Sequence, residues 1–138
     1  MGVGNDLNGD DGAGLLVCDK MEKMEGVKTA ITFTAPENFV DDAIAFKPDR
    51  VVLIGAADWG GFAGEVCELS MDTIQKAHFS THRAPLKIIR DRLAKKKILF
   101  SVVGIQAKTI GLGEQMSKEV RKACLLLAEN ILAFRSVR

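Results

Sequence analysis

The sequence predicts an α/β fold, in which the strands of a mostly parallel sheet alternate with helices. Strand-like and helix-like segments alternate along the 138 residues, which is the pattern of this fold class. Residues 50–57 (RVVLIGAA) form an almost continuous apolar run, as expected for a strand that is buried on both faces. The length favours a single domain over residues 1–138. A domain of this size buries about 68% of the surface of its unfolded chain.

The first half of the chain is expected to supply three strands and two helices. A glycine-rich segment at residues 2–14 opens a helix, but only Met1, Gly2 and Val3 come before its turn. The first strand is therefore expected to be short or truncated. Before the apolar run, a strand, a turn and a short helix are expected at residues 27–33, 34–38 and 39–46. Pro48 ends that helix, because the residue before a proline avoids helical geometry.

The second half is expected to supply two strands and two helices. Residues 64–70 alternate between apolar and polar side chains, which indicates a strand near an edge of the sheet, where it can run antiparallel. A helix begins near Pro85, since a first turn tolerates proline, and a strand follows at residues 98–104. The last helix carries an apolar stripe that is expected to face the core. The residues of this stripe are Met116, Val120, Cys124, Leu127 and Ile131.

Composition excludes several classes of protein. Nineteen basic and eighteen acidic residues leave a net charge of +1, so charge-driven binding to nucleic acid is not expected. Apolar residues make up 47% of the chain, which excludes a disordered protein. No apolar run approaches the roughly 20 residues of a membrane span, and no segment resembles a signal peptide. The scattered cysteines Cys18, Cys67 and Cys124 indicate a reducing compartment, so a cytoplasmic location is expected.

The glycine-rich segment at residues 2–14 (GVGNDLNGDDGAG) permits three interpretations. A dinucleotide fingerprint requires glycine at position 7, where this chain has Leu7, so no nucleotide is expected. A calcium loop beginning at Asp6 requires glycine where Asp11 stands and a bidentate glutamate where Val17 stands. A carboxylate site is the third interpretation, because two adjacent acids lie at the start of a predicted helix. One acid can cap the helix while its neighbour faces a cleft, although both can equally be caps.

Two further side chains are candidates for a site. Asp58 follows the apolar strand at its carboxyl end, where open α/β sheets bind their ligands, although it can equally be a simple turn residue. His82 lies just before a predicted helix, and an isolated histidine is more often structural or exposed than catalytic. Two carboxylates and an imidazole suit a borderline divalent metal such as nickel or zinc.

The combined pattern resembles the nickel–iron hydrogenase maturation endopeptidases, particularly the branch that serves hydrogenase 3 and other formate hydrogenlyase-type enzymes. The motifs that carry the resemblance occur in order and span almost the whole chain. They are GVGNDLNGDDGAG, TAPEN, the strand-end Asp58, STHRAPL and VVGIQ. In that family the second acid of the pair, the aspartate after the third strand and the histidine bind a metal and serve as catalytic residues. They match Asp11, Asp58 and His82, which leaves Asp10 as the expected cap of the helix that begins there.

The resemblance implies a three-layer α/β/α sandwich, in which a mostly parallel, twisted sheet lies between helices. It also implies a protease that removes the C-terminal extension of a nickel-loaded hydrogenase large-subunit precursor. The nickel is supplied by that precursor, which is the expected partner, and neither nucleic acid nor a membrane is expected. Some positions depart from the family. Thr32-Phe33 stand where it usually has Asp-Gly, Ala107 stands where proline commonly follows Gln106, and residues 55–58 are less acidic. A protein of the same fold that binds the metal or the maturation complex without cleaving is the alternative.

Overall fold

The computed structural model describes residues 1–79 and 83–136, and it contains one five-stranded sheet in the order β2-β1-β3-β5-β4. The strands are β1 (Gly2–Val3), β2 (Ile31–Phe33), β3 (Arg50–Ala57), β4 (Val66–Leu69) and β5 (Leu99–Gln106). The pairs β1–β2, β1–β3 and β3–β5 are parallel, whereas β4 pairs antiparallel with β5 at the edge. This arrangement confirms the predicted sheet, including its antiparallel edge strand.

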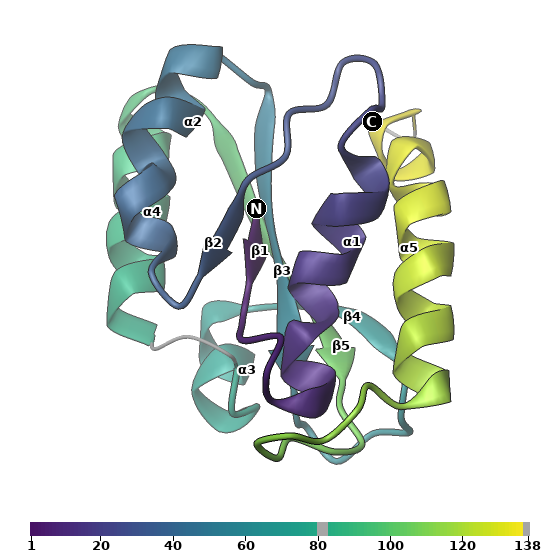
Figure 1. Cartoon of the computed structure of the whole chain (residues 1–138). Coiled ribbons are helices and arrows are strands. Elements are labelled where there is room, and N and C mark those ends of the chain that lie inside the picture. Colours follow the sequence, from purple (N-terminus) through teal and green to yellow (C-terminus); the bar gives the residue numbers. More distant parts are fainter. Residues whose placement is uncertain (80–82, 137–138) are drawn as a thin grey trace.

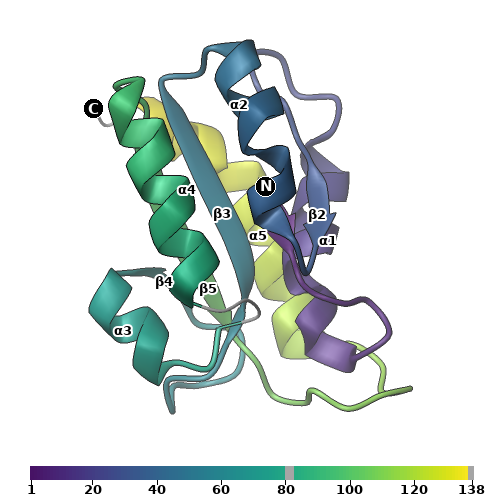
Figure 2. The same ribbon diagram turned by 90° about the vertical axis from the view of Figure 1, so that its left-hand side faces the viewer.

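Helices cover both faces of the sheet and complete the predicted sandwich. One face carries α1 (Ala13–Met21) and α5 (Lys118–Ser136), while α2 (Val40–Phe46) and α4 (Arg83–Lys95) cover the other (Figures 1 and 2). Two 3-10 turns, η1 (Gly9–Gly12) and η2 (Pro36–Phe39), lead directly into α1 and α2. Within the part of the chain that the structure describes, no helix is long and apolar enough to cross a membrane.

The sheet separates two apolar cores, and β3 contributes to both of them. Leu53 and Ala57 pack into the core beneath α2 and α4, while Ile54 and Ala56 pack into the core beneath α1 and α5. All four side chains are at most 2% exposed. The prediction that this strand is buried on both faces is therefore confirmed.

The apolar stripe of the last helix is also confirmed as core. Val120, Cys124 and Leu127 are buried between α5 and the sheet, and Met116 and Ile131 pack partly buried against the same cluster. Burial raises the pKa of the Cys124 thiol to about 12, so this cysteine stays neutral and acts as a small apolar residue.

Three elements differ from the prediction. The strand expected at residues 27–33 forms only over β2, because β1 offers just Gly2 and Val3 as pairing partners. β5 continues two residues beyond its expected end, to Gln106. Helix α3 (Met71–Lys76) was not predicted, since six residues with one buried side chain, Ile74, show no helical periodicity. Its N-cap is Ser70, whose hydroxyl accepts a hydrogen bond from the Thr73 amide.

Helix α1 lies unusually close to the strands beneath it, and glycines make this possible. A Cβ atom on Gly14 would overlap the backbone carbonyl oxygens of Ile54 in β3 and Val3 in β1. A Cβ atom on Gly2 would in turn overlap the carbonyl group of Gly14. The glycines of residues 2–14 therefore serve close packing between helix and sheet.

We expect Gly14→Ala to destabilise the protein by about 1–3 kcal/mol or more, because rigid backbone atoms would have to move to admit a methyl group. Urea unfolding of both proteins measures this difference. Gly111→Ala is the matched control, since its nearest neighbour is the flexible side chain of Glu114. It should change stability by less than about 1 kcal/mol. Equal stabilities for the two variants would contradict the close approach of α1.

Candidate functional site

The predicted acids lie on neighbouring loops at the carboxyl edge of the sheet. Asp11 belongs to η1, which follows β1, and Asp58 directly follows β3. These two strands are parallel neighbours, so the loops after them emerge at the same edge. In Figure 1 this is the lower edge, where the segments after β1 and β5 lie. The structure thus brings two of the three predicted site residues to one edge of the molecule.

The loop that carries Asp11 is shaped by the residues just before it. Its carboxylate oxygen Oδ2 accepts a hydrogen bond of 3.0 Å from the Asn5 amide, and Asn5 Oδ1 accepts one of 2.9 Å from the Leu7 amide. Gly4 has a φ of 139° and lies where a Cβ atom would overlap the Asp11 carbonyl oxygen. Gly4 and Asn5 therefore fold the loop around the half-buried Asp11.

Asp58 is exposed, and its carboxylate is held by two donors. Its Oδ1 accepts hydrogen bonds of 3.0 Å from the Gly60 amide and from Gln106 Nε2. These bonds, the one from Gln106 foremost, lower the pKa of the Asp58 carboxyl below its ordinary value. Asp58 is therefore a charged carboxylate at neutral pH, as a metal ligand or an electrostatic catalyst requires.

Gln106 is the last residue of the VVGIQ motif, but it was not predicted as a site residue. Its amide is buried at the end of β5, where Oε1 accepts from the amides of Trp59 and Gly61. Its Nε2 donates to Asp58 Oδ1 and to the carbonyl of Ala107. One side chain thus fixes both the turn after β3 and the acid within it. A buried polar residue at the carboxyl end of an apolar strand is the signal that marks such a position.

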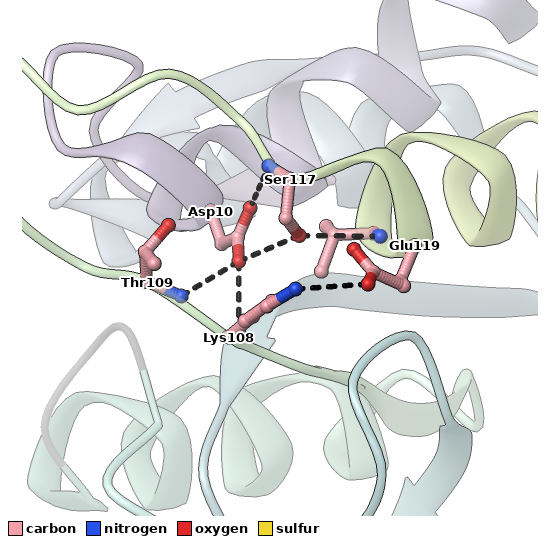
Figure 3. A network of polar contacts seen from close by, with 6 residues as sticks. Asp10, Lys108, Thr109, Ser117 and Glu119 are labelled. Carbon is pink, nitrogen blue, oxygen red and sulfur yellow. Dashed lines mark hydrogen bonds and ion pairs between the residues drawn. The ribbon is translucent and has the colours of Figure 1, made fainter.

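Asp10 does not cap the helix that begins beside it, so that prediction was wrong. The carboxylate of Asp10 is fully buried, and its hydrogen-bond partners lie between residues 108 and 117 (Figure 3). Oδ2 accepts from the amides of Lys108 and Thr109 and from Ser117 Oγ, and Oδ1 accepts from the Ser117 amide, at 2.7–3.0 Å. The Ser117 hydroxyl also accepts from the Val120 amide in the first turn of α5. Asp10 therefore fastens η1 to the start of α5.

The third predicted residue, His82, lies outside the described residues. Among the residues that the structure does describe, no three His, Cys, Asp or Glu side chains form a group able to hold a metal ion. A hollow of about 480 Å³ lies beside Asp58, and its lining includes Trp59, Thr73, Lys76 and the exposed imidazole of His78. Ala77, which precedes His78, accepts a 2.6 Å hydrogen bond from the Asp58 amide, so the segment after α3 is tied to this acid.

Comparison with known proteins gives one consistent result. The family model described as hydrogenase maturation protease matches residues 20–134. A chain of Methanocaldococcus jannaschii whose name assigns it to the hydrogenase maturation proteases is 35% identical over 122 residues, covering 80% of this chain and 72% of that one. The hydrogenase 3 maturation protease of Escherichia coli is 29% identical over 126 residues, covering 88% of this chain and 80% of that one. The crystal structure of a NiFe hydrogenase maturation protease from Thermococcus kodakarensis has a TM-score of 0.79 at 30% identity, covering 96% of this chain and 87% of that one.

We expect Asp10→Asn to destabilise the protein by about 2–3 kcal/mol. In either orientation of the new side-chain amide, its NH2 group would face a buried backbone N–H group that now donates to the carboxylate. Urea unfolding measures this loss. Asp19→Asn, at an exposed position on α1, is the matched control and should change stability by less than about 0.5 kcal/mol. Equal stability of the Asp10 and Asp19 variants would contradict the clamp to α5.

We expect Gln106→Leu to raise the pKa of Asp58 toward its ordinary value, because the largest cause of the lowered pKa is removed. In the unaltered protein the stabilising effect of the Asp58 charge is complete above the ordinary value of 3.8, and it is lost as pH falls through the lower folded-state pKa. In the variant this pH-dependent contribution should be smaller, because the folded-state pKa lies nearer the ordinary value.

Carboxyl NMR titration measures this shift. Glu119 is the internal reference, because its lowered pKa depends on Lys108 and should not move. The same variant leaves the half-buried amides of Trp59 and Gly61 without their acceptor, which costs about 1–3 kcal/mol. An unchanged Asp58 titration would contradict the assigned hydrogen bond.

Proposed function

The chain belongs to the hydrogenase maturation protease family, and from this premise we propose that it removes the C-terminal extension of a nickel-loaded hydrogenase large-subunit precursor. The enzyme is a peptidase. Its proposed substrate-recognition site consists of Asp11, Asp58 and His82, which engage the nickel ion that the precursor carries. Nickel is thus part of the substrate and is not a resident cofactor of this protein.

The position of the two acids is the observation that carries the proposal. Asp11 and Asp58 follow two adjacent parallel strands, and each is held by defined donors. Carboxylate oxygens and an imidazole nitrogen are suitable ligands for Ni²⁺, and two or three protein ligands leave coordination positions for the precursor's own groups. The exposure of Asp58 supports access by a large protein substrate.

The charge on Asp58 defines what the site contributes to cleavage. Hydrogen bonds from Gln106 and Gly60 keep this carboxylate ionised and hold Oδ1 in place before substrate arrives. A metal ion held by such ligands can polarise the scissile carbonyl, activate a water molecule or align the peptide. The three cysteines Cys18, Cys67 and Cys124 are unpaired, which supports action in a reducing compartment such as the cytoplasm.

Nickel dependence tests the proposed substrate. Purified protein is incubated with a NiFe hydrogenase large-subunit precursor, either loaded with nickel or free of it, and the precursor mass is measured. We expect a C-terminal peptide to be lost only from the nickel-loaded form. Equal cleavage of both forms would contradict recognition through nickel. Binding of the loaded precursor without mass loss would favour the alternative of a non-catalytic maturation protein.

Substitution of each proposed ligand tests the site. We expect Asp11→Asn, Asp58→Asn and His82→Ala each to lower processing of nickel-loaded precursor at least about 100-fold, since an anionic oxygen ligand or the imidazole ligand is removed. Thermal melts should show that the variants remain folded. Asp19→Asn on α1 is the control, and it should process the precursor at a rate within twofold of that of the unaltered protein. Normal processing by all three variants would contradict the site.

A further inference from the structure

Phe33 has a backbone conformation that its side chain does not favour. It ends β2 with a φ of 50°, in the left-handed region that a bulky residue rarely occupies. The residue is 54% exposed, so burial does not compensate for this conformation. A strained residue that contributes little to the core is a candidate for a functional role.

The other non-glycine residues with left-handed backbone in the described chain have a local explanation. Lys47 is the C-cap of α2, and its amide donates to the Ile44 carbonyl. Lys97 follows the end of α4, and its amide donates to the Ala94 carbonyl. His78 comes just after α3. Left-handed residues commonly end helices in this way. Phe33 ends a strand, so this explanation does not apply to it.

Phe33 is attached to the loop that carries Asp11. Its carbonyl accepts a 2.9 Å hydrogen bond from the Gly4 amide, and Gly4 lies directly against the Asp11 backbone. The preceding residue, Thr32, is buried and donates its hydroxyl to the Gly2 carbonyl at 3.1 Å, which fixes the end of β2 against β1. The backbone of the exposed Phe33 is therefore held next to the proposed metal-binding loop.

We propose that Phe33 is a specificity-determining residue whose ring contacts an apolar part of the precursor polypeptide beside the metal. This inference rests on the proposed function. The acids at this edge offer charge and hydrogen bonds to the metal, whereas the ring offers the apolar contact area that recognition of a polypeptide uses. The hydrogen bond from Gly4 places this exposed residue at the same edge of the sheet as the loop that carries Asp11.

Four variants test the role of the ring. Phe33→Asn and Phe33→Gly both accept left-handed backbone but remove the ring, whereas Phe33→Leu keeps an apolar side chain. Lys47→Gly is the matched control, since it changes a left-handed residue at a helix end. For each variant we would measure the Tm, the Kd for nickel-loaded precursor, and KM and kcat for its processing.

We expect Phe33→Asn and Phe33→Gly to raise Kd and KM about tenfold with kcat within twofold, which is the signature of a lost binding contact. Their Tm should equal or exceed that of the unaltered protein, because strain is relieved and little burial is lost. Phe33→Leu should stay within threefold in Kd, and Lys47→Gly should match the unaltered protein in Kd, KM and kcat.

Unchanged Kd and KM in the Asn and Gly variants would overturn the inference. A fall in kcat at constant KM would also overturn it, because Phe33 would then act through Gly4 on the position of Asp11. If the unaltered protein binds the precursor without cleaving it, only the proposed function fails, and the Kd series still decides the role of Phe33. If it does not bind the precursor at all, both fail.

Discussion

The backbone contact between α1 and the sheet is the constraint on which the carboxyl edge depends. With no side chain on Gly14, the first turn of α1 rests on the carbonyl oxygens of β1 and β3. The 3-10 turn η1 runs directly into that helix, so the position of Asp11 follows from the same contact. Asp10 then links the same loop to α5, because its carboxylate accepts hydrogen bonds from residues 108–117. The loop that carries Asp11 is thus built on rigid backbone.

The aspartates at this edge show how surroundings decide the role of one side chain. Asp10 is buried among N–H and O–H donors, so its charge is used to hold the structure together. Asp58 is exposed at the end of β3, where Gln106 orients one oxygen and stabilises the ionised form. The first arrangement suits a structural clamp, and the second suits a ligand for a metal that arrives with the substrate.

The proposed recognition of the precursor combines two kinds of contact at the carboxyl edge. Carboxylates beside Gly4 and Gln106 provide a charged, oriented site, while the end of β2 presents an aromatic ring on strained backbone. A protein substrate that carries a metal offers both features together, a cation and a polypeptide surface. Requiring both contacts at once would separate such a substrate from a free metal ion and from a metal-free protein.

The sequence by itself determined the α/β class, because local patterns report which faces of a segment are buried. The apolar run of β3, the stripe of α5 and the placement of Asp58 after a buried strand all follow from such patterns. The tertiary structure alone decided the length of β2, which the two residues of β1 limit. It also decided the partners of Asp10, which lie 98 to 107 positions away, and the bond from Gln106 to Asp58 across 48 positions. The spacing of these residues along the chain does not predict the contacts, because they form only when parallel strands bring distant loops to one edge of the sheet.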